Sequence, residues 1–248
     1  MAYLKVEGLV LKNQDYKEAD KLLTIYTPEG KTPSIAKGVR KVKSKMRGGV
    51  QLFCHSKFEL YQGRSSLATV TQCETINSFA SLRTDLDRFA HAVYMAEITV
   101  ELVPDREPNK DIFYLLLTCL HFLENFDPGL VTRLFEIRII NLLGYAPELN
   151  VCFHCGSSIE REAKFSLEQG GLLCSQCSGQ YKHVININMG TLASLKALSN
   201  MDLDKCCRLR LSGRDKNELS ALLGRYIELR LDKKLRSREF LNECSGSS

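Results

Sequence analysis

The sequence predicts an α+β multidomain chain, with an N-terminal OB-fold β-barrel followed by an α-helical domain that carries an inserted four-cysteine zinc ribbon. Three observations lead to this prediction. Short alternating apolar segments fill the first 80 residues, a helical period begins near residue 84, and two Cys-x-x-Cys pairs interrupt the helical pattern. The expected domains are therefore residues 1–80 and 81–248, with the ribbon at about 150–180.

The length and the N-terminus limit the class of protein. A chain of 248 residues is long enough for about two domains. It contains no run of about 18 apolar residues, so no membrane span is expected. Its first residues, "MAYLKVEGLV", lack the cationic leader, apolar core and cleavage site of a signal peptide. We therefore expect a cytoplasmic protein, whose ten cysteines are metal ligands or free thiols rather than disulfides.

Five short strands are expected in the first domain. Turn signals such as Pro28-Glu29-Gly30 and Gly63 separate them. The strands cover residues 3–12, 21–27, 31–38, 52–61 and 65–76. Five half-buried strands in such a short segment fit a small antiparallel barrel of the OB type. An SH3-like barrel is the structural alternative.

Helical periodicity dominates the second domain. Helices are expected over residues 84–103, 110–126, 130–144, 191–199 and 216–237. Thr84 or Asp85 is the expected N-cap of the first. The second is apolar nearly all round, which predicts a central, buried helix.

Four cysteines in two close pairs predict a metal site. The pattern is C-x2-C, then 18 residues, then C-x2-C, formed by Cys152, Cys155, Cys174 and Cys177. A two-residue gap lets one tight turn present two thiolates to a tetrahedral ion, and the intervening hairpin returns the second pair. Four thiolates leave no position for water or substrate, so we expect one structural zinc per chain. His154, between two ligands, is expected to be exposed.

No catalytic residues are predicted. A redox Cys-x-x-Cys expects a βαβ pattern that is not visible, and a zinc deaminase needs an H-x-E that none of the histidines begins. "PEGKTP" contains the Gly-Lys-Thr of a phosphate-binding loop. Such a loop also needs a glycine five residues before Gly30, and that position holds Ile25. Asp15, Glu18 and Asp20 could contribute to metal-assisted chemistry, but a solvated turn is the better interpretation. We therefore expect a protein that is not an enzyme.

The charge is distributed unevenly along the chain. Residues 1–80 carry 13 Lys and Arg against 7 Asp and Glu, residues 81–204 carry 10 against 16, and residues 205–248 carry 11 against 6. Basic ends around an acidic middle favour an anionic partner. Ordinary solubilising charge is the alternative.

The stretch "AKGVRKVKSKMRGG", residues 36–49, is the most basic part of the sequence, and we call it the basic segment. It lacks acidic residues and holds six cations, Lys37, Arg40, Lys41, Lys43, Lys45 and Arg47. Beside a barrel face, these cations could bind phosphates without reading bases, because no Asn or Gln accompanies them. A plain solvated loop is the alternative. Aromatic candidates for base stacking are Tyr3, Tyr26, Phe53, Phe58 and Tyr61, half of which are expected in the core.

Several stretches of the chain resemble the RecO family of bacterial recombination mediators. The most specific are "DYKEADKLLTIYT", "AKGVRKVKSKMRG" and, near the end, "LRSREFL". The order of barrel, helical domain, four-cysteine insertion and C-terminal basic helix is also similar, so the resemblance spans essentially the whole chain.

This resemblance implies a role in DNA repair and recombination. RecO proteins bind single- and double-stranded DNA, anneal complementary strands and hydrolyse no nucleotide. With RecR, and in some contexts RecF, they help load RecA onto DNA coated by single-stranded-DNA-binding protein (SSB), in the bacterial cytoplasm at the nucleoid. It implies that the four cysteines are zinc ligands and that the six cations contact DNA. A zinc-dependent nucleic-acid enzyme and a zinc-stabilised protein scaffold are the alternatives.

Overall fold

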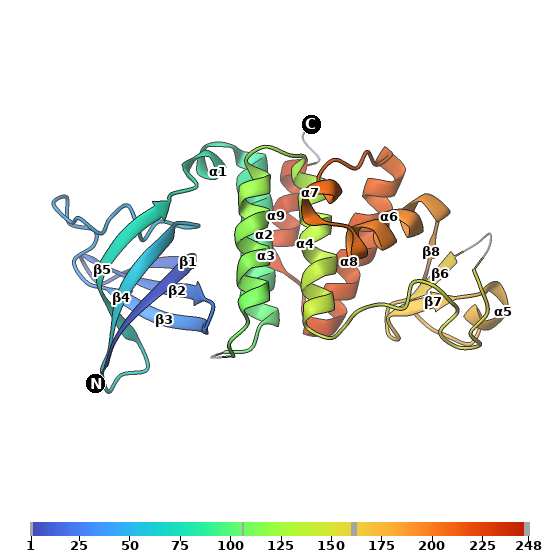
Figure 1. Cartoon of the computed structure of the whole chain (residues 1–248), viewed down its shortest axis with the longest axis horizontal. Coiled ribbons are helices and arrows are strands. Elements are labelled where there is room, and N and C mark those ends of the chain that lie inside the picture. The colour runs from blue at the N-terminus through green and yellow to red at the C-terminus, as the bar shows by residue number, and fades with distance from the viewer. Residues whose placement is uncertain (1, 106, 160–162, 246–248) are drawn as a thin grey trace. The chain divides into compact units, whose positions relative to one another are not determined.

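The computed structural model describes residues 2–105, 107–159 and 163–245 (Figure 1). It divides into two compact units, whose main segments are Met1–Glu124 and Asn125–Glu243. None of the helices in the described part of the chain is long and apolar enough to cross a membrane.

The first unit begins with a closed five-stranded barrel. Its strands are β1 (Ala2–Tyr16), β2 (Asp20–Thr27), β3 (Gly30–Ala36), β4 (His55–Gln62) and β5 (Ala68–Asn77). Their order around the barrel is β1-β2-β3-β5-β4, which confirms the predicted OB-type barrel. The long strand β1 pairs with β4 through its first half and with β2 through its second half.

The barrel closes where β3 meets β5, and this seam is short. Only two register pairs, Ser34 with Ala68 and Ile35 with Thr69, join the two strands in parallel. The core inside the barrel contains residues from every strand, such as Val10, Ile25 and Phe58. Each such fully buried apolar side chain contributes about 1.5–3 kcal/mol of transfer free energy.

Three helices complete the first unit, and two of them pack against the barrel. They are α1 (Ala80–Thr84), α2 (Leu86–Leu102) and α3 (Lys110–Leu123). The side chain of Asp85 caps α2 by accepting a hydrogen bond from the backbone of Arg88, as expected for an N-cap. Helix α3 is buried along one face only, because Tyr114 is 52% exposed on the other. The prediction of all-round burial for this helix is therefore wrong.

The second unit is helical. Its helices are α4 (Pro128–Leu142), α5 (Ser175–Ser178), α6 (Met189–Asn200), α7 (Leu203–Cys206), α8 (Gly213–Leu231) and α9 (Arg236–Ser245). Helix α4 is the most enclosed and buries even the ion pair between Arg133 and Glu136. The expected single helix over 216–237 is wrong, because Asp232 takes a left-handed conformation with φ of 51° and ends α8.

A small antiparallel sheet interrupts the helices of the second unit. Its strands β6 (Ala163–Ser166), β7 (Gly171–Leu173) and β8 (Val184–Ile187) follow the order β7-β6-β8. The four cysteines flank β6 and β7 in the sequence. The predicted insertion is therefore a separate small sheet, which follows α4 and precedes α6 in the sequence and lies to one side of the helices (Figure 1).

Candidate metal centre and nucleic-acid interface

The four predicted cysteines converge in the structure. Cys152 and Cys155 belong to a tight turn before β6, in which the backbone N–H of Gly156 donates to the carbonyl of Cys152. Cys174 directly follows β7, and Cys177 lies in α5. All four Sγ atoms lie within 4.8 Å of one another. These residues could therefore hold one metal ion.

The spacing of the sulfur atoms fits a tetrahedral thiolate site. A metal–sulfur distance of about 2.3 Å places sulfur atoms about 3.8 Å apart at the corners of a tetrahedron. The Sγ atoms of Cys155 and Cys174 are 3.9 Å apart. Cys152 is fully buried, whereas Cys155 is exposed. The site therefore lies at the edge of its subdomain rather than in a deep cavity.

Local hydrogen bonds favour thiolates at three of these positions. Burial opposes this at Cys152, but backbone hydrogen bonds outweigh it and lower the pKa of that thiol. The hydroxyl of Ser157, 3.1 Å from the Sγ of Cys155, lowers the pKa of that thiol. The backbone N–H of Cys177 lowers the pKa of Cys174. The Cys174 sulfur and burial raise the pKa of Cys177 to about 12. Four thiolates repel one another unless a cation lies between them, so this donor set fits a soft divalent metal.

The surroundings of the cluster leave His154 outside the ligand set. Its side chain is exposed, as expected, and its Nδ1 lies 2.7 Å from the hydroxyl of Tyr181. Tyr181 also packs edge-on against Phe153. These aromatic rings and Leu173 form a small apolar cluster around Cys152 and Cys177. Such a small cluster provides little core of its own, and a metal ion bound by the four cysteines would add a constraint.

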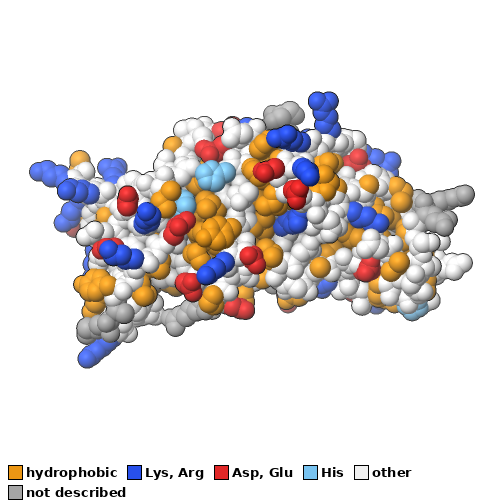
Figure 2. All heavy atoms as spheres, viewed as in Figure 1, with side chains coloured by type: hydrophobic (Ala, Val, Ile, Leu, Met, Phe, Trp, Pro, Cys, Tyr) orange, Lys and Arg blue, Asp and Glu red, His pale blue; other side chains and the backbone are white. Residues whose placement is uncertain are grey.

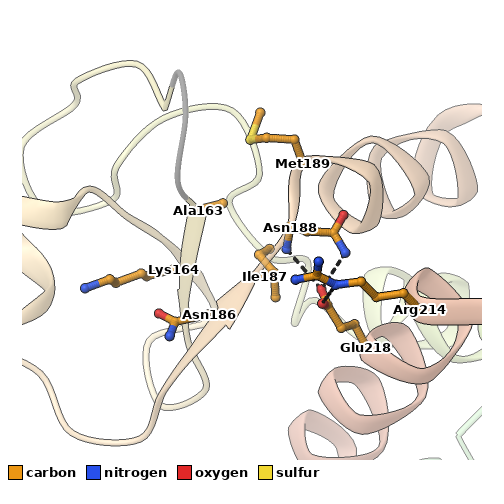
Figure 3. A pocket seen from close by; sticks show the side chains of 8 residues that line it. All are labelled: Ala163, Lys164, Asn186, Ile187, Asn188, Met189, Arg214 and Glu218. Atoms are coloured by element: carbon orange, nitrogen blue, oxygen red, sulfur yellow. Dashed lines mark hydrogen bonds and ion pairs between the residues drawn. The ribbon is translucent and has the colours of Figure 1, made fainter.

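A carboxylate fastens the three-stranded sheet to the helices (Figure 3). Glu218 of α8 accepts hydrogen bonds from the backbone N–H and side chain of Asn188 and from the hydroxyl of Thr191, at 2.9–3.0 Å. Arg214 approaches its other oxygen at 2.9 Å. These contacts hold the pKa of Glu218 down at about 2, despite the opposing effect of desolvation. They line a cavity of about 470 Å³ beside β6 and β8.

The basic segment connects β3 to β4 and is anchored at several points. Val39, and Val50 directly after the segment, are buried in the barrel core, and Met46 packs against it. The thiol of Cys73 on β5 lies 3.6 Å from the carbonyl oxygen of Met46. Gly49 approaches β5 so closely that a Cβ there would lie 2.7 Å from the Cys73 sulfur. The barrel therefore determines where this connection lies.

Acidic residues of the β1–β2 hairpin hold the start of the basic segment. Asp20 accepts a hydrogen bond of 2.7 Å from the backbone N–H of Gly38. Asp15 lies 3.2 Å from Arg40, which also donates to the backbone carbonyls of Lys17 and Glu18. The interpretation of these acidic residues as a solvated turn therefore missed their contacts with the basic segment. The acids were visible in the sequence, but Gly38 and Arg40, which they contact, lie about 20 residues further along the chain.

The remaining cations of the basic segment are free to meet a ligand. Side chains of Lys37, Lys41, Lys43, Lys45 and Arg47 are exposed, and within the described ranges none of them forms an ion pair. Figure 2 shows Lys and Arg side chains projecting at this end of the barrel. Of the six cations predicted to contact DNA, Arg40 is thus the one that already pairs with groups of the chain itself.

The predicted aromatic residues separate into two groups. Tyr26, Phe53 and Phe58 are buried in the core. Tyr3 is 73% exposed, and its ring centre lies 5.1 Å from that of half-buried Tyr61. Of the five candidates, Tyr3 and Tyr61, on β1 and β4, are the ones that keep aromatic surface within reach of solvent.

Comparisons with known proteins agree with this architecture. The family model for the N-terminal part of recombination protein O matches residues 1–79, and the C-terminal model matches residues 83–239. The chain belongs to the RecO family. The DNA repair protein RecO of Desulforamulus reducens is 39% identical over 100% of this chain and 97% of its own length. The RecO proteins of Heliobacterium modesticaldum and Pelotomaculum thermopropionicum are 41% and 39% identical, over 92% and 94% of their lengths.

Membership of the RecO family confirms the resemblance and the role in DNA repair and recombination. The barrel and the cysteine cluster each lie within one matched model, residues 1–79 and 83–239 respectively. The cysteines outside the cluster do not gather into a second metal-binding group among the described residues. Burial raises the pKa of Cys54 and Cys73, so these thiols are poor nucleophiles at neutral pH.

Proposed function

We propose that this RecO-family chain is a non-catalytic recombination mediator that binds single- and double-stranded DNA and anneals complementary strands. The observation that carries the proposal is the basic segment, which the barrel holds in place while five of its cations remain exposed without an ion pair among the described residues. Anchoring reduces the conformational entropy that binding would otherwise cost.

Electrostatic screening provides the proposed mechanism. Two complementary strands repel each other through their phosphates. Lys and Arg side chains that neutralise phosphates of one strand lower this repulsion, so the second strand can approach and pair. In this proposal, residues 1–80 form the DNA-binding domain and residues 81–248 the helical domain with its ribbon. The contacts go to phosphates, so annealing depends on complementarity between the strands rather than on a recognition sequence.

Two substitutions at the tip of the basic segment test this role. Each phosphate neutralised on a single strand contributes about 0.7 to the logarithmic salt slope, which corresponds to about fivefold in affinity at 0.1 M salt. We expect Lys41→Ala with Lys43→Ala to lower the slope by about 1.4 and to weaken binding about 25-fold, measured by fluorescence anisotropy with an oligothymidine.

A matched control removes two cations from elsewhere on the barrel. Lys57 on β4 and Arg64 in the β4–β5 connection are exposed, lie outside the basic segment and form no ion pair within the described part of the chain. Lys57→Ala with Arg64→Ala changes the net charge by the same amount. An equal loss in both double variants would show that only overall charge matters. An unchanged slope in the Lys41 and Lys43 variant would refute the assigned role.

We further propose that Cys152, Cys155, Cys174 and Cys177 bind one structural zinc ion. The sulfur spacing and the donor set support this choice. Cobalt substitution tests it, because four thiolates give intense charge-transfer bands and leave no exchangeable water. A cobalt spectrum with bound water would instead favour the alternative of a zinc-dependent nucleic-acid enzyme.

The proposed partners are RecR and SSB, with RecF and RecA in the same process, in the cytoplasm at the nucleoid. Family membership supports them. An annealing assay on naked and SSB-coated DNA, with and without RecR and across salt concentrations, separates a mediator from a general DNA-binding protein. A protein scaffold stabilised by zinc would retain no DNA even at low salt.

A further inference from the structure

A polar cavity lies between the β1–β2 hairpin and the basic segment. Its volume is about 330 Å³, at the lower end of the ~300–1,000 Å³ typical of small-ligand sites. Three chain segments line it, and all belong to the first unit. The lining residues are Asp15, Lys21, Val39, Arg40, Arg47, Val50 and Gln51.

The charges around this cavity are mainly positive. Lys21, Arg40 and Arg47 contribute three cations, whereas Asp15 is the single carboxylate of the lining. Asp15 already lies 2.8 Å from Lys21 and 3.2 Å from Arg40, and the hydrogen bond from Lys21 lowers its pKa. Its charge is thus shared between two cations, and the third cation has no ion pair within the described part of the chain.

The walls of the cavity are fixed before any ligand binds. Asp15 and Lys21 are register partners across the β1–β2 pair. Lys21 has an 18% exposed side chain, and its ammonium group is held 2.8 Å from Asp15. Directly after the basic segment, Val50 is buried, and the amide of Gln51 donates to the backbone carbonyl of Arg47 at 2.8 Å. The position of Lys21 and the backbone of Arg47 are thus set in advance, which reduces the reorganisation needed to meet an anion.

We propose that this cavity is a phosphate subsite that takes one phosphodiester group of a bound DNA strand. Lys21 and Arg47 donate to the phosphate oxygens, while Arg40 and Asp15 keep the walls in position. Arginine suits this task because its planar donors match phosphate geometry. The inference rests on the proposed DNA-binding function, and it adds Lys21, a residue outside the basic segment, to the contacts.

Two cations that share one phosphate have a measurable signature. We expect Lys21→Gln and Arg47→Gln each to leave the salt slope for an oligothymidine nearly unchanged, because the remaining cation still neutralises the shared phosphate. The double variant should lower the slope by about 0.7 and the affinity at 0.1 M salt about fivefold, because one phosphate is then lost. A loss of about 1.4 in the double variant would mean two separate contacts and would overturn the shared subsite.

Controls separate this proposal from the general one. Lys57→Gln with Arg64→Gln removes two cations of the same barrel outside the cavity and should leave the slope unchanged. Thermal unfolding followed by circular dichroism shows that each variant remains folded. If the wild type binds DNA and the Lys41 and Lys43 variant weakens it, but the Lys21 and Arg47 double variant does not, only the subsite is wrong. If the wild type retains no DNA at low salt, the proposed function itself fails.

Free phosphate is the other source of the same chemistry. Inorganic phosphate, titrated against chloride at constant ionic strength, should displace the oligothymidine from the wild type more effectively than from the double variant. Stabilisation of the wild type by phosphate, together with DNA binding that the substitutions leave unchanged, would identify a site for free anions and overturn the proposal.

Discussion

The carboxylate of Glu218 offers the sharpest test of how the three-stranded sheet is attached to the helices. Replacing it with glutamine preserves the size of the side chain but removes its charge. One oxygen can still accept from Asn188 or Thr191, but the amide group then faces the guanidinium of Arg214, and two donors meet. The perturbation therefore converts charge-assisted hydrogen bonds into at most neutral ones.

The magnitude follows from the pKa of Glu218. A decrease from 4.5 to about 2 corresponds to roughly 3 kcal/mol, at about 1.4 kcal/mol per unit. The side chain remains 23% exposed, so screening by solvent reduces this figure. Charged hydrogen bonds contribute about 1.5–3 kcal/mol each and neutral ones about 0.5–1.5. We expect Glu218→Gln to lower the free energy of unfolding by about 2 kcal/mol at pH 7.

The pH dependence has a defined sign. Because folding lowers the pKa of Glu218, the stabilisation is fully present above about pH 4.5 and is lost as the pH falls toward 2. The difference between wild type and variant should therefore stay constant from pH 7 to pH 5 and shrink below pH 4.5. Comparing the two proteins at each pH cancels any release of the proposed zinc ion, because both proteins keep the four cysteines.

Urea unfolding and amide hydrogen exchange of residues 184–191 provide the measurement. Arg214→Ala is the matched control, because it removes only the ion pair of a side chain that is 76% exposed, worth about 0.5 kcal/mol or less. Equal losses in the two variants would refute the reasoning, as would a difference for Glu218→Gln that does not change below pH 4.5.

Three further substitutions test the ribbon. Cys174→Ser should abolish stoichiometric zinc binding. It should also abolish the hydrogen-exchange protection of residues 150–187, while the barrel keeps its protection. Loss of barrel structure in this variant would contradict independent folding of the two parts. Gly170→Ala should destabilise the second unit by about 1–3 kcal/mol in urea unfolding, because Gly170 has φ of 69° and its Cβ would meet the hydroxyl of Tyr226. Gly156→Ala, with φ of 73° but open space around it, should cost about 1 kcal/mol, and an equal cost at both positions would exclude the clash with Tyr226.

Local patterns were enough to predict the barrel and the cluster of four cysteines. Alternating apolar residues mark each strand, and paired cysteines specify their own geometry through the short turns between them. The helix end at Asp232 was missed because the apolar period continues beyond it, while the chain turns through a left-handed residue that is not glycine. Propensity alone gave no sign of this break.

Contacts between distant segments were beyond the reach of the sequence. The hairpin acids and the basic segment were each visible, but their pairing through Asp15 and Arg40 depends on how β2 and β3 return the chain. Likewise, Glu218 looked like one more charged residue on an amphipathic helix. Its importance comes from Asn188, which lies 30 residues earlier and reaches it only in the folded unit.

The short seam between β3 and β5 links ligand binding to the integrity of the barrel. Strand β5 pairs with β4 along most of its length but with β3 at only two positions, and Met46 and Gly49 of the basic segment lie against Cys73 of β5. The segment thus adds contacts to a strand that the short seam holds weakly. By mass action, any ligand that binds the segment in this position also resists opening of the barrel at that seam. Occupancy should therefore slow amide exchange in β5, although the cations that meet the ligand belong to another segment.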